Sequence, residues 1–442
     1  MNDVPALPQR RILGLWWPLA ASWLLMGTEL PLFTACVARM REPEVNLAAY
    51  GSLVFPIALV IEAPIMMLLA AATALASDQD SWRKVRRFMH ASGAALTAVH
   101  LTIAFTPLFD LLARQVFGVP EVVIEPARLG LRILTPWTWS IAYRRTHQGV
   151  LIRYESGRPV IIGTALRLLG NACVFGLGFA LQARGVDVPG IVVGASAVAC
   201  GVLSEALFIG WCTRSVLAER GLPERGSGAP LTRAAFLRFY VPLALTPLIA
   251  LLTQPLGAAA IARMRDPLAS LAAWPAVHGL LFLSRSPGFA YNEVVVSLLE
   301  RPGAVPALRR FGLVLGGASL LVLLVVATTP LARLWFGWVS GLSQELTALA
   351  STALTCAILW PAAQALQSWF QGSLVHARST RGVTEAMGVF FLTTAALFYV
   401  GARWSDWNGL HFAILALTLG SLAQTAWLGL RSHQQRARTP LA

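Results

Sequence analysis

Long apolar runs, each about the length that crosses a lipid bilayer, recur along the whole chain. A membrane-spanning helix needs about 20 mainly apolar residues, and these runs meet that length. We therefore predict an all-α integral membrane protein with twelve transmembrane helices. The predicted spans are Leu13–Val37, Leu47–Ala76, Ala91–Leu112, Val122–Tyr143, Val160–Ala183, Pro189–Cys212, Leu237–Ala262, Leu268–Leu298, Phe311–Leu331, Leu346–Gln371, Val383–Val400 and Trp407–Leu430.

The charged residues support a lipid environment. Only 13% of the 442 residues are charged, about half of what a soluble domain carries, roughly 25%. The net charge of +14 does not indicate nucleic-acid binding, because the basic residues form short clusters between apolar runs rather than one face with interleaved aromatic residues. We therefore expect the protein to have a lipid bilayer, and no nucleic acid, as its partner.

The basic clusters also predict an orientation. Lys and Arg are concentrated in every second loop, starting with Arg10 and Arg11 before the first span and Arg83–Arg87 before the third. Loops that are rich in Lys and Arg stay on the cytoplasmic side. We therefore predict a multi-pass protein of the plasma (inner) membrane with both termini in the cytoplasm.

The two halves of the chain repeat each other. The sequence ARMREP at Ala38–Pro43 recurs as ARMRDP at Ala262–Pro267, an offset of 224, and the same offset relates Leu47-Ala48-Ala49 to Leu271-Ala272-Ala273. We predict an N-terminal six-helix bundle over 1–213, a cytoplasmic linker over 214–232 and a C-terminal six-helix bundle over 233–442. Six spans per half give a parallel repeat, an arrangement that in transporters encloses a cavity for alternating access.

At these repeat blocks the sequence resembles the progressive ankylosis protein family. The matching pieces are Leu47-Ala48-Ala49-Tyr50-Gly51, Tyr240-Val241-Pro242-Leu243-Ala244-Leu245, Thr146-His147-Gln148-Gly149, Arg153, and Pro287 followed by Glu293. That family is similar in fold to multidrug and toxin extrusion (MATE-like) transporters. The resemblance implies export of small polyanions such as pyrophosphate, nucleotides including ATP, or citrate. The chain departs from the family pattern at Met67, Leu69, Val295, Gln367 and Trp369, which implies a less charged cavity.

Charged and polar side chains inside the predicted spans are candidates for function, because an ionisable group at membrane depth needs a partner or a role. A guanidinium binds carboxylate or phosphate through its planar fork. The candidate anion contacts are Arg132, Arg167 and Arg285, with Gln254, Asn292, Gln364 and Gln367 as polar companions. Snorkelling towards lipid headgroups is the alternative for Arg167, and Glu205 and His278 are further ionisable residues in the apolar runs.

Two carboxylates are candidates for a gate or for ion coupling. Glu62 lies two residues before Pro64 and Arg285 two residues before Pro287, so the repeat places them at matching positions. They form either a gate that cargo opens or a static ion pair. Glu293, beside Asn292, either binds a coupling ion, H⁺ or Na⁺, or makes a structural contact.

A basic group follows the predicted fourth span. Arg144, Arg145, His147 and Arg153 either form a vestibule at the inner mouth of the cavity or reflect membrane topology and headgroup contact.

Motifs of soluble enzymes are absent from the sequence. It contains no GxxxxGK[ST] phosphate loop, no HExxH zinc motif and no GxSxG elbow. The five cysteines form no CxxC pair. We expect no enzyme activity, no metal and no cofactor. The leading hypothesis is a secondary or facilitated transporter that exports a small anionic solute. The alternatives are a lipid or drug flippase on the same scaffold, and a non-transporting intramembrane enzyme or assembly factor.

Overall fold

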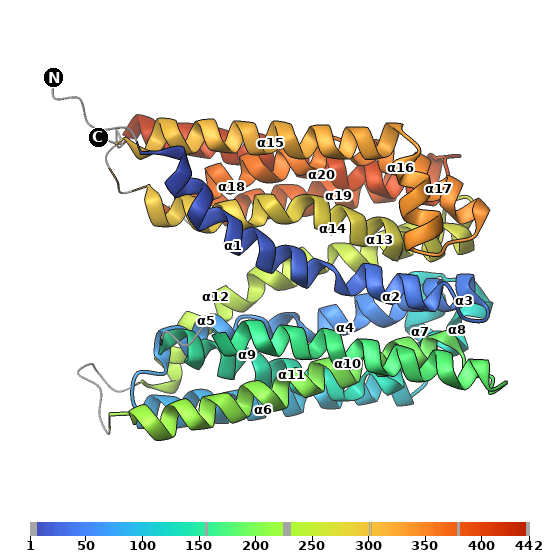
Figure 1. The fold of residues 1–442 in the computed structure, drawn as a ribbon, viewed down its shortest axis with the longest axis horizontal. Coiled ribbons are helices and arrows are strands. Elements are labelled where there is room, and N and C mark those ends of the chain that lie inside the picture. Colours follow the sequence, from blue (N-terminus) through green and yellow to red (C-terminus); the bar gives the residue numbers. More distant parts are fainter. Residues whose placement is uncertain are drawn as a thin grey trace. The chain divides into compact units, whose positions relative to one another are not determined.

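The computed structural model describes residues 7–154, 158–223, 231–299, 301, 303–377 and 381–438. Within this part of the chain all named elements are helical (Figure 1). They form two compact units. Unit 1 contains residues 1–39 and 260–442, and unit 2 contains residues 40–259.

Unit 2 begins with a helical segment whose backbone hydrogen bonding changes along its length. Its elements are α3 (Pro43–Ala49), the π-helix η1 (Tyr50–Val54), α4 (Phe55–Glu62), the 3₁₀-turn η2 (Ala63–Ile65), α5 (Leu68–Leu75), α6 (Gln79–Phe105), α7 (Leu108–Leu111), the π-helix η3 (Leu112–Phe117), α8 (Glu121–Ile133), α9 (Thr135–Arg153), α10 (Arg158–Ala183), α11 (Gly190–Arg220), α12 (Arg233–Leu251) and α13 (Thr253–Ile261), whose last residues belong to unit 1.

Unit 1 combines the first two helices of the chain with its C-terminal helices. Its elements are α1 (Gln9–Gly27), α2 (Glu29–Val37), α14 (Pro267–Leu298), α15 (Ala304–Thr328), α16 (Leu331–Arg333), the π-helix η4 (Leu334–Val339), α17 (Gln344–Leu354), the 3₁₀-turn η5 (Thr355–Ala357), α18 (Trp360–His376), α19 (Arg381–Trp404) and α20 (Gly409–Arg438). The beginning of α1 and the end of α20 lie at the same end of this unit (Figure 1).

The two units do not coincide with the two predicted bundles, of which the first ends at residue 213 and the second begins at residue 233. Helix α1 packs against α14, where the indole Nε1 of Trp16 donates to the carbonyl oxygen of Pro287 at 2.9 Å. In the same way α12 packs in unit 2, where the Tyr240 hydroxyl donates to the Pro64 carbonyl oxygen at 2.5 Å. The first span of each half therefore packs with helices of the other half. The predicted linker also begins later, because α11 continues to Arg220, and its residues 224–230 lie outside the described part of the chain.

Eleven helices in the described chain are long and apolar enough to span a membrane. The predicted fourth span, Val122–Tyr143, is the one that does not qualify. It holds Arg128 and Arg132, and its helix is interrupted at Leu134 between α8 and α9. This segment is less apolar than the other predicted spans, and its helix α9 packs against α5, α6 and α11 in unit 2.

The internal repeat extends to the backbone. Glu42 and Asp266, which occupy equivalent positions, both have a positive φ, 48° and 53°, and each is followed by a proline that begins a helix. A left-handed conformation is costly for residues other than glycine. Its occurrence at two equivalent positions indicates that both copies need the same sharp turn before α3 and α14.

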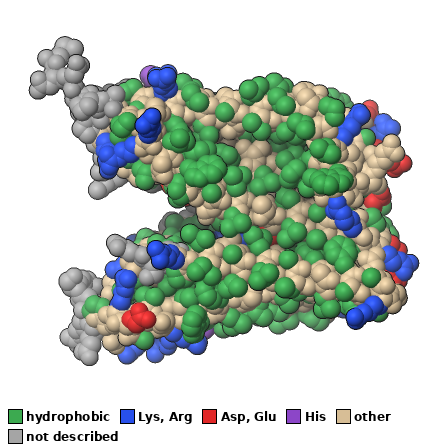
Figure 2. All heavy atoms as spheres, in the orientation of Figure 1, with side chains coloured by type: hydrophobic (Ala, Val, Ile, Leu, Met, Phe, Trp, Pro, Cys, Tyr) green, Lys and Arg blue, Asp and Glu red, His purple; other side chains and the backbone are tan. Residues whose placement is uncertain are grey.

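The outer surface fits a lipid environment. Large apolar side chains such as Leu207 and Trp211 are about two-thirds exposed. Figure 2 shows hydrophobic side chains along the helices and Lys and Arg mainly near the helix ends. A soluble protein rarely exposes so much contiguous apolar surface, so the exposed faces are suited to acyl chains.

Candidate functional site

Arg285 is the central residue of the candidate site in unit 1. It lies on α14, and its Nη2 donates to Oε1 of Gln364 on α18 at 2.7 Å. Its guanidinium carbon lies 4.3 Å from the ring centroid of Trp360 and 5.1 Å from that of Phe289. Within the described residues, no ion pair to a carboxylate involves Arg285. Its positive charge is therefore held by one neutral amide and two aromatic faces.

Buried nitrogen atoms without a hydrogen bond occur in this guanidinium and in the rings of neighbouring residues. The ring of His278, two turns before Arg285 on α14, lies 6.4 Å from the ring of Trp360. In the described structure the buried atoms His278 Nε2, Arg285 Nε and Trp360 Nε1 make no hydrogen bond. Buried polar atoms normally find a partner. This cluster is therefore suited to a ligand that supplies acceptor atoms and negative charge.

The other polar candidates of unit 1 lie further along the same helices. Glu293 is exposed within unit 1 and accepts from Trp23 Nε1 at 3.4 Å, while Asn292 Nδ2 donates to the Ser368 carbonyl oxygen at 3.3 Å. Gln367 is buried, and its Nε2 donates to the Ser421 and Thr425 hydroxyl oxygens at 2.9 and 3.0 Å. The structure thus brings Gln364 to Arg285, and it uses Gln367 to join α18 to α20.

Unit 2 contains a buried ionic cluster around Glu205. This carboxylate is fully buried and accepts from Arg144 Nη1 at 2.8 Å and from Gln148 Nε2 at 3.1 Å. Arg167 Nε lies 3.6 Å from the same carboxylate. Glu205 therefore compensates the charge of two guanidiniums at the meeting of α9, α10 and α11. Arg167 is bound inside the bundle rather than snorkelling to the headgroups.

The four predicted vestibule residues do not gather on one open surface of unit 2. Arg144 and His147 are buried, and the His147 ring stacks on that of Tyr143 at 4.0 Å. Arg145 Nη2 lies 3.7 Å from the sulfur of Met66 and interacts electrostatically with buried Glu62. Arg153 Nη1 donates to the Thr73 carbonyl oxygen at 2.8 Å near the end of α5. Their contacts hold helices of unit 2 together.

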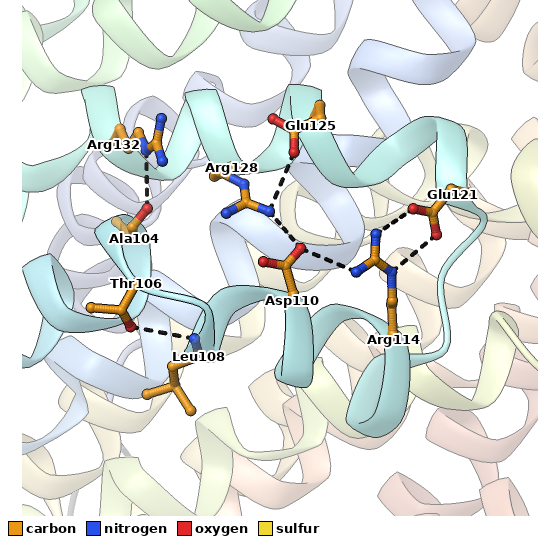
Figure 3. A network of polar contacts seen from close by, with 9 residues as sticks. All are labelled: Ala104, Thr106, Leu108, Asp110, Arg114, Glu121, Glu125, Arg128 and Arg132. Carbon is orange, nitrogen blue, oxygen red and sulfur yellow. Dashed lines mark hydrogen bonds and ion pairs between the residues drawn. The ribbon is translucent and has the colours of Figure 1, made fainter.

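Arg132 lies on α8, whose arginines make polar contacts to α6 and α7 (Figure 3). Its Nε donates to the Ala104 carbonyl oxygen at 3.0 Å, near the end of α6. Arg128, one turn earlier, forms an ion pair with Asp110 at 2.5 Å. Gln254 is half-buried on α13. Arg132 and Gln254 belong to unit 2 and Arg285 to unit 1, so a shared site of these residues remains a prediction.

The aromatic partners of Arg285 are the part of this site that the sequence analysis missed. Phe289 follows Arg285 by four residues on the same helix, so helical spacing is a usable signal for that contact. Trp360 comes from α18, and no spacing rule connects it to α14. Arg285 and Glu62 belong to different units, so their predicted pairing remains a prediction.

The described chain is all-helical, and its fold matches those of MATE-like membrane transporters. The chain superimposes on an inward-facing MATE-family multidrug resistance transporter of the MOP superfamily with a TM-score of 0.69 and 14% identity, covering 93% of this chain and 96% of that one. A MOP superfamily transporter from Pyrococcus furiosus, described as having a binding pocket of reverse polarity, gives 0.64 and 14%, covering 98% and 99%. The lipid II flippase MurJ in an inward closed conformation gives 0.68 and 13%, covering 94% and 86%. No protein-family model and no curated protein matches the sequence.

Proposed function

We propose that this protein is a membrane transporter that moves small organic or phosphate-bearing anions, such as pyrophosphate, nucleotides or citrate, by alternating access of its repeated bundles. The observation that supports an anionic cargo is the environment of Arg285. Arg285 is half-buried and its Nε is buried, and a guanidinium withdrawn from water is costly unless an opposite charge compensates it. Arg144 and Arg167 have Glu205 nearby, whereas Arg285 has a neutral amide and aromatic rings. A bound anion would supply the missing charge.

The MATE-like fold supports transport rather than catalysis. Parallel repeats of this kind commonly serve alternating access in membranes. The progressive ankylosis family is our proposed relationship, resting on the short matches around residues 47–51 and 240–245. We further propose a location in the plasma membrane with both termini in the cytoplasm, supported by the distribution of basic loops.

The remaining candidates have proposed supporting roles. Glu293 is our candidate for a coupling site for H⁺ or Na⁺, because its carboxylate is exposed within unit 1 and, among the described residues, accepts one long hydrogen bond, from Trp23 at 3.4 Å. Glu62 is our candidate gate residue. We assign Arg144 and Arg167 a structural role that supports the transport pathway, because Glu205 holds both.

A flux assay in proteoliposomes tests the proposed function. Vesicles that contain the purified full chain are loaded separately with pyrophosphate, ATP, citrate or a cationic dye, and release is followed over time. We expect release of at least one of the anions and none of the dye. Replacement of Arg285 by Gln should abolish anion release, and Arg285→Lys should give partial release because an ammonium lacks the planar fork.

Arg309→Gln is the matched control. Arg309 is exposed on α15 in the same unit, so this change removes one positive charge without touching the candidate site. Its flux should equal that of the wild type. Release of the dye alone, or unchanged anion release by Arg285→Gln, would overturn the proposal.

A lipid flippase is the second candidate, because the chain also has the fold of the lipid II flippase MurJ. Translocation of a fluorescent anionic lipid between leaflets, in the absence of any flux of soluble anions, would favour this alternative.

A further inference from the structure

A groove with an apolar floor and a basic rim lies between the beginnings of α6 and α12 in unit 2. Its volume is about 490 Å³. Phe88, Ala91, Phe236 and Leu237 supply apolar walls, and the rim carries Lys84, Arg87 and Arg233. The groove is distinct from the Arg285 site, which lies in unit 1.

Aromatic packing fixes the floor of this groove. The ring of Phe88 on α6 lies 4.6 Å from that of Phe236 and 4.9 Å from that of Tyr240, both on α12. The Tyr240 hydroxyl is in turn bonded to the Pro64 carbonyl oxygen. These contacts hold α6 and α12 together below the rim. The shape of the groove is therefore fixed by packing within unit 2.

The positive charges of the rim are only partly compensated by a neighbouring carboxylate. Lys84 pairs with Asp80 at 2.5 Å. Arg87 and Arg233 are exposed, and among the described residues neither forms an ion pair. Two guanidiniums on separate helices thus face a groove whose walls are apolar. A negatively charged group with an attached apolar chain matches both features.

We propose that this groove binds the headgroup of an anionic phospholipid, with an acyl chain along the apolar walls. Both helices qualify as membrane spans, and the rim residues lie near the ends at which α6 and α12 begin. Basic pockets between transmembrane helices are suited to anionic lipid headgroups. A soluble phosphate would use only the rim, whereas a lipid uses the rim together with Phe236 and Leu237. The bound lipid would clamp α12 onto α6.

Native mass spectrometry of the full chain in detergent tests this site. The probes are phosphatidylglycerol and phosphatidylcholine with identical acyl chains, and the readout is the dissociation constant of the first bound lipid. Phosphatidylglycerol should bind more tightly than phosphatidylcholine. The double variant Arg87→Gln with Arg233→Gln should weaken phosphatidylglycerol binding by about 25-fold, roughly fivefold for each removed charge, and leave phosphatidylcholine binding unchanged.

The matched control is Arg309→Gln with Arg310→Gln, which removes two adjacent exposed charges from α15 in the other unit. This control pair should bind phosphatidylglycerol as tightly as the wild type does. The double variant Arg87→Lys with Arg233→Lys, which keeps both charges, should also bind it with the affinity of the wild type. Glycerol 3-phosphate at millimolar concentration should not displace the lipid. Equal weakening by the α15 control, or displacement by glycerol 3-phosphate, would overturn the proposal.

Discussion

Charged side chains between the helices of this protein are accommodated in two different ways. Glu205 is surrounded by Arg144, Arg167 and Gln148, so the cluster is both charge-compensated and hydrogen-bonded. Arg285 is held by Gln364 and aromatic rings. A compensated cluster serves cohesion between helices, whereas an uncompensated cation is available to a ligand. The repeat sharpens this contrast, because Gln367 joins α18 to α20 through hydroxyl groups where Arg144 joins α9 to α11 through a carboxylate.

Glu205→Gln should destabilise unit 2 strongly. The change keeps the shape of the side chain but leaves nearby buried guanidiniums without its negative charge, and breaking a buried pair in this way costs about 3–5 kcal/mol. The thermal unfolding midpoint in detergent measures the effect. Glu293→Gln is the control, because Glu293 is exposed in unit 1, and its midpoint should stay near that of the wild type. An unchanged midpoint for Glu205→Gln would show that the cluster does not stabilise the bundle.

Several helices begin at specific capping arrangements, and the cap of α6 is the most complete. Asp78 Oδ1 accepts from the Ser81 amide at 2.9 Å, and its Oδ2 accepts from the Ser77 and Ser81 hydroxyls at 2.8 and 2.9 Å. The backbone hydrogen bond from Ser81 is the largest cause that lowers the pKa of Asp78, with the two hydroxyl bonds adding to it. The ionised carboxylate therefore favours the folded state.

Asp78→Ala should lower the free energy of unfolding by about 1 kcal/mol at pH 7, the usual effect of losing a helix cap. Because the folded pKa is lowered, this contribution is present above the unfolded value of about 3.9 and is lost as the pH falls through the folded pKa. Thermal unfolding of both proteins at pH 7 and near pH 3 checks this. Asp80→Ala, which removes an exposed pair with Lys84, should change stability only slightly. A difference between wild type and Asp78→Ala that persists unchanged at low pH would contradict the assignment.

The left-handed turns before α3 and α14 offer a second test at the level of elements. Glu42→Gly should stabilise the protein by up to about 1 kcal/mol, because glycine adopts a positive φ without steric cost. Asp266→Gly should gain less, since Asp266 also accepts from Asn408 Nδ2 at 3.2 Å. The unfolding midpoints of the two variants give the comparison. If Glu42→Gly were destabilising, the turn would depend on the glutamate side chain.

The sequence predicted the helical membrane fold well. Hydropathy indicates where the membrane-spanning helices lie, and the 224-residue offset indicates that the two halves of the chain repeat each other. The least apolar predicted span is Val122–Tyr143, where Arg128 and Arg132 lie on α8 and the helix is interrupted at Leu134. The contact of Trp16 with Pro287, and that of Tyr240 with Pro64, join residues far apart in the chain, and no local pattern encodes them. Trp360 was missed as a partner of Arg285 for the same reason, whereas Phe289 lies four residues after Arg285 on the same helix and could have been found from that spacing.

The orientation of the whole molecule can be tested with reporters at the two ends of the chain. A fluorescent protein that matures only in the cytoplasm, fused separately to each terminus, should be fluorescent in both fusions. A periplasmic phosphatase at the same positions should be inactive. The reason is the excess of Lys and Arg in the loops that share a side with the termini. An active phosphatase at either end would contradict the predicted topology.

The most direct test of the central claim is equilibrium binding of labelled pyrophosphate, ATP and citrate to the purified protein, with wild type and Arg285→Gln compared side by side. We predict that at least one of these anions binds the wild type and that Arg285→Gln weakens its affinity by about 30-fold or more, the effect of removing one partner of a buried charge pair. Equal affinities in the two proteins, or binding of a cationic solute at this site instead, would contradict the account.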